Sequence, residues 1–442
     1  MTRSASESRA ARPANSGSRY GIGAGGTTAQ RIIAAEGTGA LVAATMRAMR
    51  VAVVAEWYPS PADPVLGVWA HRQAVAARDA GADVCVLALR RPVPPLSAAR
   101  AGVAAVREWA RDAPSMLEPW ELDGIPIEPV PFLAPPRPVS YGSWGWWMAP
   151  TLSRALARQA VDVVHAHSIL PPGHAVHLTR RRGPARVVST HGPDVIHVAG
   201  ASRWARRATA DTLRGADLVL ANSSWAERRC RELGGASIAT EVVHLGADLP
   251  AVADTRHARP TLVTVAHLVA RKRHAVVLHA LAELAPERRP DYVVIGDGPG
   301  REPLARMAAE LGLDGTVRFA GQLPHERALA EAARCHVFVM PGVEEPFGVA
   351  FVEAMAAGLP AIGARGEGGP EDIAAAGPGL LLVPPDDHIA LARTLSDLLA
   401  DPAALAALGA SARETVARAF TWERCGAATV AAYERAMRSA RR

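Results

Sequence analysis

The stretch TLVTVAHLVARKRHAVVLHAL, residues 261–281, decides the fold that the sequence predicts. Residues 261–269 form an apolar run of strand length, and a helical pattern follows through residues 278–285. Between them stands Lys272, the one lysine among the 49 Lys and Arg residues of the chain. A lysine ammonium is a compact point charge that a planar guanidinium does not imitate at a tight anionic site. Lys272 therefore indicates an anion-binding site, with chance survival in an Arg-rich chain as the alternative.

The alternation of strand and helix continues towards the C-terminus. Further strands are predicted within residues 291–300, 316–321, 336–342 and 359–365. Strands that alternate with helices in this way predict a parallel sheet. Ligands of such sheets bind at the carboxyl ends of the strands, and Lys272 stands just past the first of them.

The first half of the chain repeats this pattern. Residues 50–61 are an apolar run that ends in a Pro-rich turn, and residues 68–89 predict a helix, a stop at Gly81 and a strand. Residues 90–150 are Pro-rich and are expected to be irregular. Further strands are predicted within residues 162–168, 185–192, 216–224 and 239–248.

Several residues fall where ligands of this half would bind. Gly67 lies in the loop between the first strand and its helix. His165, His167 and His191 fall at or near strand C-termini, where a histidine either caps the sheet by hydrogen bonding or takes part in catalysis.

The length of 442 residues is too great for one typical core and favours two domains. We predict an N-terminal domain over 49–250 and a C-terminal domain over 260–420, with a cleft between them and a polar, Pro-flanked linker. Residues 1–48 lack the periodicity of packed elements and are expected to be a disordered extension. The Gly-x-Gly-x-x-Gly at 21–26 follows no strand, so it does not predict a dinucleotide site.

Composition limits the classes of partner. The net charge of +6 is only mildly basic for this length, so we expect no nucleic-acid partner. No run of about 18 apolar residues is present, and the four cysteines have no CxxC spacing, which favours a cytoplasmic, reducing location. Trp144, Trp146 and Trp147 are expected to be packing residues. The alternatives are an acceptor platform or an anchor in peripheral contact with the anionic inner face of a membrane.

The segment PGVEEPFGVAFVEAMAAGLP, from residue 341 onward, carries the most informative spacing. It follows a predicted strand and leads into a helix that is expected to start near Gly348 and to end at Gly358. The free amides of that first turn predict an anion site, because glycine lets a phosphate approach the backbone. Glu345 just before the helix and Glu353 within it are placed to bind sugar hydroxyls, although a pair of Glu at this spacing is common on surfaces.

These motifs together resemble glycosyltransferase family 4, the retaining nucleotide-sugar enzymes of the GT-B fold. EPFGVAFVEAMAAGLP resembles the family's E-x7-E segment, and AHLVARKRH resembles its Gly-Arg-Leu-Val-x-x-Lys-Gly stretch, with His267 on the arginine and Arg273 on the glycine. GEGGPEDI resembles its Gly-Gly-x-Pro-Glu loop, with Pro370 directly after Gly369. The resemblance covers roughly residues 50–440.

The resemblance implies an α/β fold of two Rossmann-like domains facing a cleft, with a helix over 421–442 that crosses back onto the first domain. It implies that a nucleotide-diphosphate sugar is the donor, that no cofactor is needed, and that the transfer is retaining and metal-independent. The sequence contains no Asp-x-Asp metal motif. The implied catalytic residues are His191, Lys272 and Glu345. The implied donor-binding residues are Gly67, His267, Lys272, Glu345, Phe347, Gly348, Val349 and Glu353.

Other function classes remain beside this one. A P-loop enzyme is excluded, because its lysine would follow a glycine and Lys272 follows Arg271. A Schiff-base enzyme finds no supporting residues around Lys272. A sugar-nucleotide epimerase of the same fold and a non-catalytic nucleotide-sugar-binding protein are the two alternatives. The acceptor, whether a glycan, a lipid-linked sugar or a small molecule, is open, as are the sugar, the base and the oligomeric state.

Overall fold

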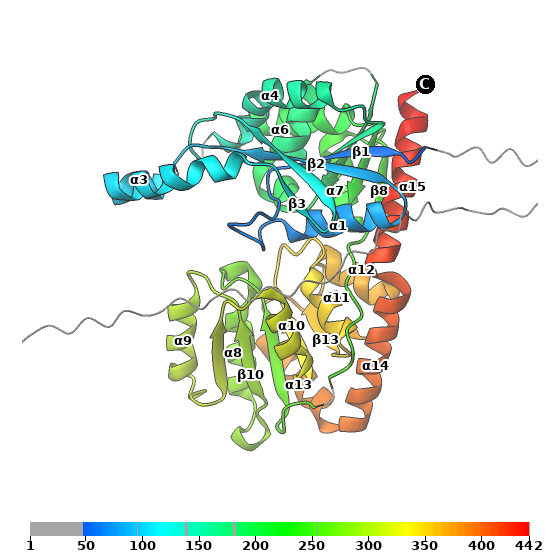
Figure 1. The fold of residues 1–442 in the computed structure, drawn as a ribbon. Coiled ribbons are helices and arrows are strands. Elements are labelled where there is room, and N and C mark those ends of the chain that lie inside the picture. Colours follow the sequence, from blue (N-terminus) through cyan, green and yellow to red (C-terminus); the bar gives the residue numbers. More distant parts are fainter. Residues whose placement is uncertain (1–46, 95, 138–139, 180–182, 254, 442) are drawn as a thin grey trace, which may run out of the picture. The chain divides into compact units, whose positions relative to one another are not determined.

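The computed structural model describes residues 47–94, 96–137, 140–179, 183–253 and 255–441. The predicted disorder of 1–48 and the glycine motif at 21–26 therefore concern residues that lie almost wholly outside the described ones. The described chain forms two sheets, one from strands of the first half and one from strands of the second (Figure 1).

The first sheet has eight strands in the order β3-β4-β2-β1-β5-β6-β7-β8, and all neighbours are parallel except β3 and β4. The order places β1 between β2 and β5, so successive strands are added outward first on one side and then on the other. Ligands of open α/β sheets bind at this switch point, outside the carboxyl ends of the strands. The strands are β1 Arg50–Ala55, β2 Asp83–Arg90, β3 Trp120–Leu122, β4 Ile125–Pro131, β5 Val163–His167, β6 Ala185–Thr190, β7 Leu218–Ala221 and β8 Thr240–Val242.

The second sheet has six parallel strands in the order β11-β10-β9-β12-β13-β14. Its switch point lies between β9 and β12, the strands that precede Lys272 and the segment from residue 341. The strands are β9 Thr261–Val265, β10 Asp291–Ile295, β11 Val317–Gly321, β12 Val337–Met340, β13 Ala361–Ala364 and β14 Leu380–Val383. The sequence patterns predicted all of them except β14.

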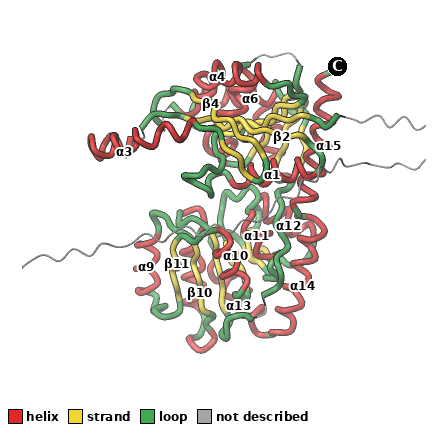
Figure 2. The backbone as a smooth tube through the Cα atoms, viewed as in Figure 1, coloured by secondary structure: helices red, strands yellow, loops and turns green. Residues whose placement is uncertain are grey.

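Both faces of the first sheet are covered by helices, which is why β1 reads as an unbroken apolar run. Val51 and Val53 of β1 pack on the face covered by α1 and α15, whereas Ala52 and Val54 pack on the face covered by α4, α5 and α6. Figure 2 shows α1, α4, α6 and α15 around the sheet. The helices of the first half are α1 Val68–Asp79, α2 Leu96–Ala101, α3 Val103–Asp112, α4 Trp144–Arg158, α5 His174–Leu178, α6 Arg203–Arg214 and α7 Ser224–Gly234.

The second sheet is covered in the same way. Leu262 of β9 belongs to the cluster with α8, α9 and α13, and Val263 belongs to the cluster with α10, α11 and α14. The remaining helices are α8 His274–Glu283, α9 Arg301–Glu310, α10 His325–Ala333, α11 Val349–Ala356, α12 Gly368–Ala376, α13 His388–Ala400, α14 Pro402–Ala419 and α15 Trp422–Ala440.

The expectation that residues 90–150 are irregular is wrong. They contain the helices α2 and α3, the start of α4 and the strands β3 and β4. The prolines of β4, IPIEPVP, hid the strand, because proline removes a ladder donor and normally argues against a central strand. β4 nevertheless pairs with β2 on one side and with β3 on the other, and it buries Ile125, Ile127 and Val130 in the core.

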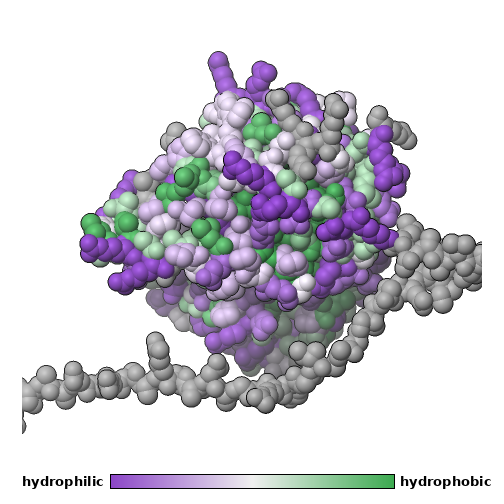
Figure 3. Space-filling model, turned by 45° about the horizontal axis from the view of Figure 1, so that its top comes forward, coloured by the Kyte–Doolittle hydropathy of each residue, from purple (hydrophilic) through white to green (hydrophobic). Residues whose placement is uncertain are grey.

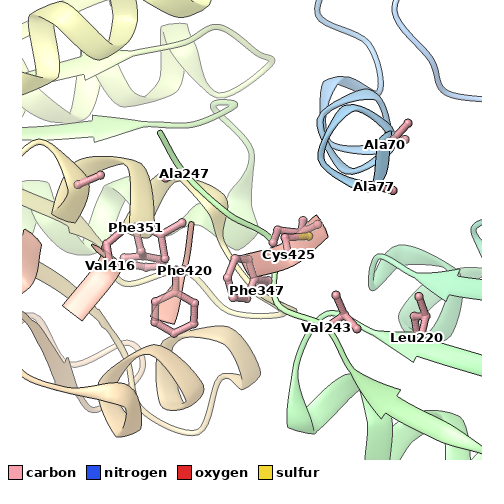
Figure 4. Packing of buried hydrophobic residues seen from close by; sticks show 14 of the residues in the cluster. Ala70, Ala77, Leu220, Val243, Ala247, Phe347, Phe351, Val416, Phe420 and Cys425 are labelled. Carbon is pink, nitrogen blue, oxygen red and sulfur yellow. The ribbon is translucent and has the colours of Figure 1, made fainter. Parts of the chain in front are cut away.

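The last helix crosses back onto the first sheet, as the fold prediction requires. Gln73 Nε2 of α1 donates to Thr429 Oγ1 of α15 at 3.0 Å, and Tyr433 Oη lies 2.7 Å from His165 Nδ1 of β5. Gly426 allows close packing, since a Cβ there would lie 2.1 Å from the carbonyl oxygen of Ala76. Phe347, Phe420 and Cys425 lie in one buried cluster that includes residues of both sheets (Figure 4).

Candidate functional site

A cavity of about 500 Å³ lies at the switch points of both sheets. Its walls include the segments that follow β1, β5, β6, β7 and β8 in the first sheet and β9 and β12 in the second. The lining residues that carry polar groups or aromatic rings are Trp57, Trp69, Tyr141, Ser168, His191, Asp194, Asn222, Lys272, Glu345 and Phe347, and the wall also includes Gly348 and Val349.

Lys272 is buried in this wall. It ends the short 3-10 turn Ala270–Lys272 after β9, and its ammonium donates to the Glu345 carboxylate. The two side chains are only 11% and 8% exposed, and Arg271 Nη1 lies 3.8 Å from the same carboxylate. The pairing with the carboxylate offsets the cost of burying the ammonium charge. The site thus holds an ammonium ready to meet an anionic ligand.

Arg273 stands where the family motif has a glycine, and it adopts the backbone conformation of that glycine. It has φ 55 and ψ 33, the left-handed conformation in which glycine is favoured. Its guanidinium is held by Asp386, with Nε 2.7 Å from Oδ1. The turn therefore keeps the glycine-like backbone while carrying an arginine.

Two backbone amides fix the segment after β12, one by a bond to the lysine turn and one by a bond to the Glu367 side chain. Val343 N donates to Arg271 O at 2.8 Å, and Glu345 N donates to the Glu367 carboxylate at 2.9 Å. Gly348 then adopts φ 82 as the N-cap of α11, where a Cβ would lie 2.6 Å from the Phe351 ring. The predicted helix start near Gly348 is confirmed. The first amides of α11 reach the cavity through Gly348 and Val349.

Glu353 lies within α11 and does not line the cavity. Its carboxylate is 3.5 Å from His325 Nε2, and its side chain is 20% exposed. Burial, followed by the negative charge of Asp248, raises the pKa of Glu353 to about 7. The two glutamates of the predicted pair are thus separated. Glu345 lines the cavity, whereas Glu353 lies beside His325 of α10.

His191 follows β6 and lines the cavity from the other sheet. Burial lowers the pKa of His191 to about 4, so the ring is neutral at physiological pH and acts as a hydrogen-bonding group. A hydrogen bond of 2.9 Å joins its Nε2 to His167 Nδ1, and the two rings stack with centroids 5.1 Å apart.

His167 is the residue whose role the sequence left open. Burial, then the nearby imidazoles, hold its pKa well below the ordinary value, so it is also neutral. Its bond to His191 places it next to the cavity as a support. His165, by contrast, bonds Tyr433 Oη and Ser189 Oγ, at 2.7 and 2.6 Å, and ties the sheet to α15. The spacing of two histidines at the end of one strand was the available signal, but it does not say which of them meets His191.

Asp194 holds the loop that carries His191. Thr190 Oγ1 and Gly192 N donate to its Oδ1 at 2.8 and 3.1 Å, and Ile169 N donates to its Oδ2 at 2.8 Å. This buried carboxylate therefore joins the segment after β5 to the segment after β6. No sequence motif pointed to it.

Besides Glu353, two further predicted donor-binding residues, Gly67 and His267, do not line the cavity. Gly67 is the N-cap of α1 with φ 77, and a Cβ there would lie 2.1 Å from Trp57 O, so it shapes the loop between Trp57 and Trp69. His267 is exposed and contributes its carbonyl oxygen to His274 Nε2 at 3.3 Å. The remaining predicted residues, namely His191, Lys272, Glu345, Phe347, Gly348 and Val349, are brought together at one cavity.

Within the described residues, no group of three or more His, Cys, Asp or Glu side chains is placed to hold a metal ion. The four cysteines are free thiols. Of the helices in the described part of the chain, none combines the length and the apolar character needed to cross a bilayer.

The chain is similar to known glycosyltransferases along most of its length. The family described as Glycosyltransferase Family 4 matches residues 66–250, and that described as Glycosyl transferases group 1 matches residues 248–415. A GDP-mannose-dependent alpha-(1-6)-phosphatidylinositol monomannoside mannosyltransferase of Mycolicibacterium smegmatis is 32% identical, over 63% of this chain and 78% of the relative. A 2-deoxystreptamine glucosyltransferase of Streptomyces kanamyceticus is 30% identical, over 66% and 82%.

Solved structures agree on the fold. A sucrose-phosphate synthase from Thermosynechococcus elongatus superposes with a TM-score of 0.67 at 21% identity, covering 87% of this chain and 98% of that one. HepE of Anabaena, solved with UDP and glucose, gives 0.62 at 19% identity, covering 87% and 99%. With two parallel-rich sheets and a crossing C-terminal helix, the chain belongs to the family 4 glycosyltransferases, enzymes of the GT-B fold that transfer a glycosyl group from a nucleotide sugar.

Proposed function

We propose that this glycosyltransferase retains the configuration of the transferred sugar and uses Lys272 in place of a metal ion. The observation that carries the proposal is the wall of the cavity, where the Lys272 ammonium, the Glu345 carboxylate and the start of α11 meet. As the glycosidic bond of the donor breaks, negative charge grows on the leaving diphosphate. A fixed ammonium and free helix amides lower the barrier because they are already oriented towards that charge.

The other residues have positioning roles in this proposal. Lys272 exchanges its bond with Glu345 for bonds with the diphosphate, and Glu345 then accepts hydrogen bonds from the transferred sugar. Neutral His191 binds a sugar hydroxyl from the opposite wall. Same-face attack lets a leaving phosphate oxygen take the proton of the acceptor hydroxyl. The protein then needs to supply mainly orientation.

The test is Lys272→Ala, measured with a donor that the parent enzyme accepts. We expect kcat to fall roughly 100- to 1,000-fold, which is the usual cost of removing one preorganised charge-stabilising group. Arg306→Ala removes an exposed cation of α9 and should behave as the parent. Equal turnover by the Lys272 variant would refute the proposal. Incubation with donor alone separates transfer from the epimerase alternative, which would yield an epimerised nucleotide sugar.

The donor itself can be identified by thermal shift, because a ligand that binds only the folded state raises the melting temperature. One relative uses GDP-mannose, and one structural neighbour was solved with UDP-glucose. The screen should therefore begin with these two and continue to ADP sugars. Addition of a chelator should leave turnover unchanged if the reaction is metal-independent.

Peripheral contact with an anionic membrane is also proposed, on the surface of α4 and α6. Trp146, Trp147 and Trp204 are 57%, 48% and 39% exposed. The rings of Trp146 and Trp204 both contact the ring of His174. The exposed arginines of α6 beside them are Arg203, Arg206 and Arg207. On the face in Figure 3, hydrophobic side chains (green) lie in patches among hydrophilic ones (purple). Tryptophan with arginine is the composition that anchors proteins at lipid headgroups.

Vesicle sedimentation tests this contact. The protein should sediment with phosphatidylglycerol vesicles at low salt and be released at high salt, because the attraction is screened. The double variant Trp146→Ala/Trp147→Ala should remain in the supernatant. Sedimentation of the parent with neutral phosphatidylcholine alone, to the same extent, would contradict an electrostatic contact.

A further inference from the structure

A second cavity, of about 430 Å³, lies at the same carboxyl edge of the first sheet, past the ends of β1, β2 and β4. Trp57 lines both this cavity and the one that holds His191 and Lys272, so the two adjoin. The polar lining residues are Glu56, Arg90, Arg91 and Arg137, and the apolar ones include Leu66, Leu89, Met116 and Phe132.

The lining carries more positive than negative charge. The Arg137 guanidinium is paired with the Glu56 carboxylate, which also accepts from Tyr141 Oη at 2.8 Å. Within the described lining, the positive charges of Arg90 and Arg91 therefore have no carboxylate to balance them. The carboxylate of Asp63, which acts on Arg90 through its charge, lies on an exposed residue outside this lining.

Both excess guanidiniums are held in fixed orientations. Arg91 donates from Nε to Ala134 O at 2.8 Å and lies 5.3 Å from the centre of the Trp144 ring. Arg90 donates from Nη2 to Tyr58 O at 3.2 Å and lies 5.1 Å from the Trp120 ring. A guanidinium that is already oriented loses little freedom when its planar fork binds a phosphate.

The surroundings of Arg90 and Arg91 disfavour positive charge on both guanidiniums. Burial, followed by the charge of Arg137, lowers the pKa of Arg91, and burial lowers the pKa of Arg90. A nearby anion favours the cationic form of a guanidinium and would act against both effects.

We propose that this arginine-lined cavity binds the phosphate group of the acceptor, so that the acceptor is a phosphorylated alcohol. The inference rests on the proposed function, because the donor sugar is placed in the adjoining cavity. The apolar lining then contacts the body of the acceptor, while the phosphate sits between Arg90 and Arg91. A hydroxyl of the same molecule extends past Trp57 towards the donor. The phosphate belongs either to a soluble ester or to a lipid headgroup.

Binding of phenyl phosphate, measured by ligand-observed NMR with phenol as its uncharged counterpart, tests the cavity directly. We expect saturable binding of phenyl phosphate and none of phenol. Arg91→Gln should weaken the binding roughly tenfold or more, since charge-assisted bonds to phosphate are lost. Arg107→Gln, an equal change of charge at an exposed position of α3, should bind as the parent does.

Two further variants keep the result interpretable. The double variant Glu56→Gln/Arg137→Gln removes one ion pair and leaves the net charge of the lining unchanged, so it should retain binding. Lys272→Ala should retain binding, because its ammonium lies in the other cavity. Loss in Lys272→Ala together with retention in Arg91→Gln would assign the phosphate to the donor site and overturn the proposal, as would equal binding by all variants.

Comparison of sn-glycerol 1-phosphate with phosphatidylglycerol vesicles identifies the source of the phosphate. Loss of vesicle sedimentation in Arg91→Gln but not in Arg107→Gln supports a lipid headgroup. Loss of glycerol phosphate binding with unchanged sedimentation supports a soluble ester. The proposed function fails independently of these results if the parent protein binds none of the nucleotide sugars.

Discussion

Glu353 is a single carboxyl group that titrates near neutral pH, because burial and the charge of Asp248 raise its pKa to about 7. If it accepts the ribose hydroxyls of the donor, the ionised form should bind better than the acid. The ionised fraction rises about tenfold between pH 6 and pH 8 for such a group. We therefore expect the KM for the donor to fall by about tenfold over that interval, measured from initial rates at each pH.

Glu353→Gln is the control for this pH dependence. Its KM should be high and nearly independent of pH. The other charged groups around the carboxyl are His325, Asp248 and Arg72, and they are unchanged in the variant. A carboxyl pKa raised in the folded state adds stability below the unfolded value of about 4.5, and this stability is lost as pH rises through about 7. The variant should thus be more stable than the parent at pH 8, by roughly 1–3 kcal/mol.

His167 is predicted to act through His191. Replacement of His167 by Leu removes the 2.9 Å bond and leaves His191 Nε2 without its partner in a buried position. We expect kcat to fall roughly 10- to 100-fold, because His191 no longer orients the transferred sugar. The affinity for nucleoside diphosphate should change little.

His167→Asn distinguishes positioning from mere packing. The amide of Asn reaches the place of Nδ1 and should recover most of kcat, although it fills less of the core than Leu does. Equal losses in the Asn and Leu variants would show that His167 serves only the stability of β5.

At the level of elements, the sequence predicted the strands that alternate with helices and the glycine-started helix α11. It succeeded because β1 and β9 are buried on both faces and read as plain apolar runs. It failed for β4, whose three prolines mask a strand, and it missed the short β14. Among the residues at the cavity, it singled out Lys272, Glu345 and His191, left the role of His167 open and did not point to Asp194. The roles of His167 and Asp194 depend on contacts between the segments of β5 and β6.

The start of α11 depends on Gly348, and a matched glycine allows its contribution to be measured. Gly348→Ala adds a Cβ at 2.6 Å from the Phe351 ring and 3.2 Å from Glu345, in a backbone with φ 82. We expect the variant to lose roughly 2–4 kcal/mol of unfolding free energy and most of its donor affinity, because the helix start and Glu345 must both shift. Chemical denaturation and nucleotide titration measure the two effects.

Gly366→Ala is the control, because Gly366 has the same φ of 82 but open space around its Cβ position. It should cost only about 1 kcal/mol, the strain of the left-handed backbone. Equal effects of the two substitutions would mean that the backbone conformation alone, and not the contact with Phe351 and Glu345, sets the geometry of the helix start.

At the scale of the whole molecule, the site exists only where the two sheets meet. Lys272 and Glu345 come from segments that follow strands of the second sheet, and His191 follows a strand of the first. Gly192 lies next to Pro346, where these segments adjoin. A Cβ on Gly192 would lie 1.8 Å from Pro346 Cγ. No pattern within either half of the sequence reports this approach, because the contact joins segments about 150 residues apart along the chain.

Gly192→Ala should therefore push the His191 loop away from Glu345 while leaving the second sheet intact. We expect nucleoside diphosphate to bind with nearly parental affinity and kcat to fall roughly 100-fold, because misplacement by about 1 Å is enough for such a loss. Gly235→Ala is the matched control, since Gly235 has φ 104 against φ 103 for Gly192 and no atom near its Cβ position. If the clash with Pro346 is the cause, the double variant Gly192→Ala/Pro346→Gly should recover much of the lost rate, whereas backbone strain alone would leave both Gly192 variants equally slow.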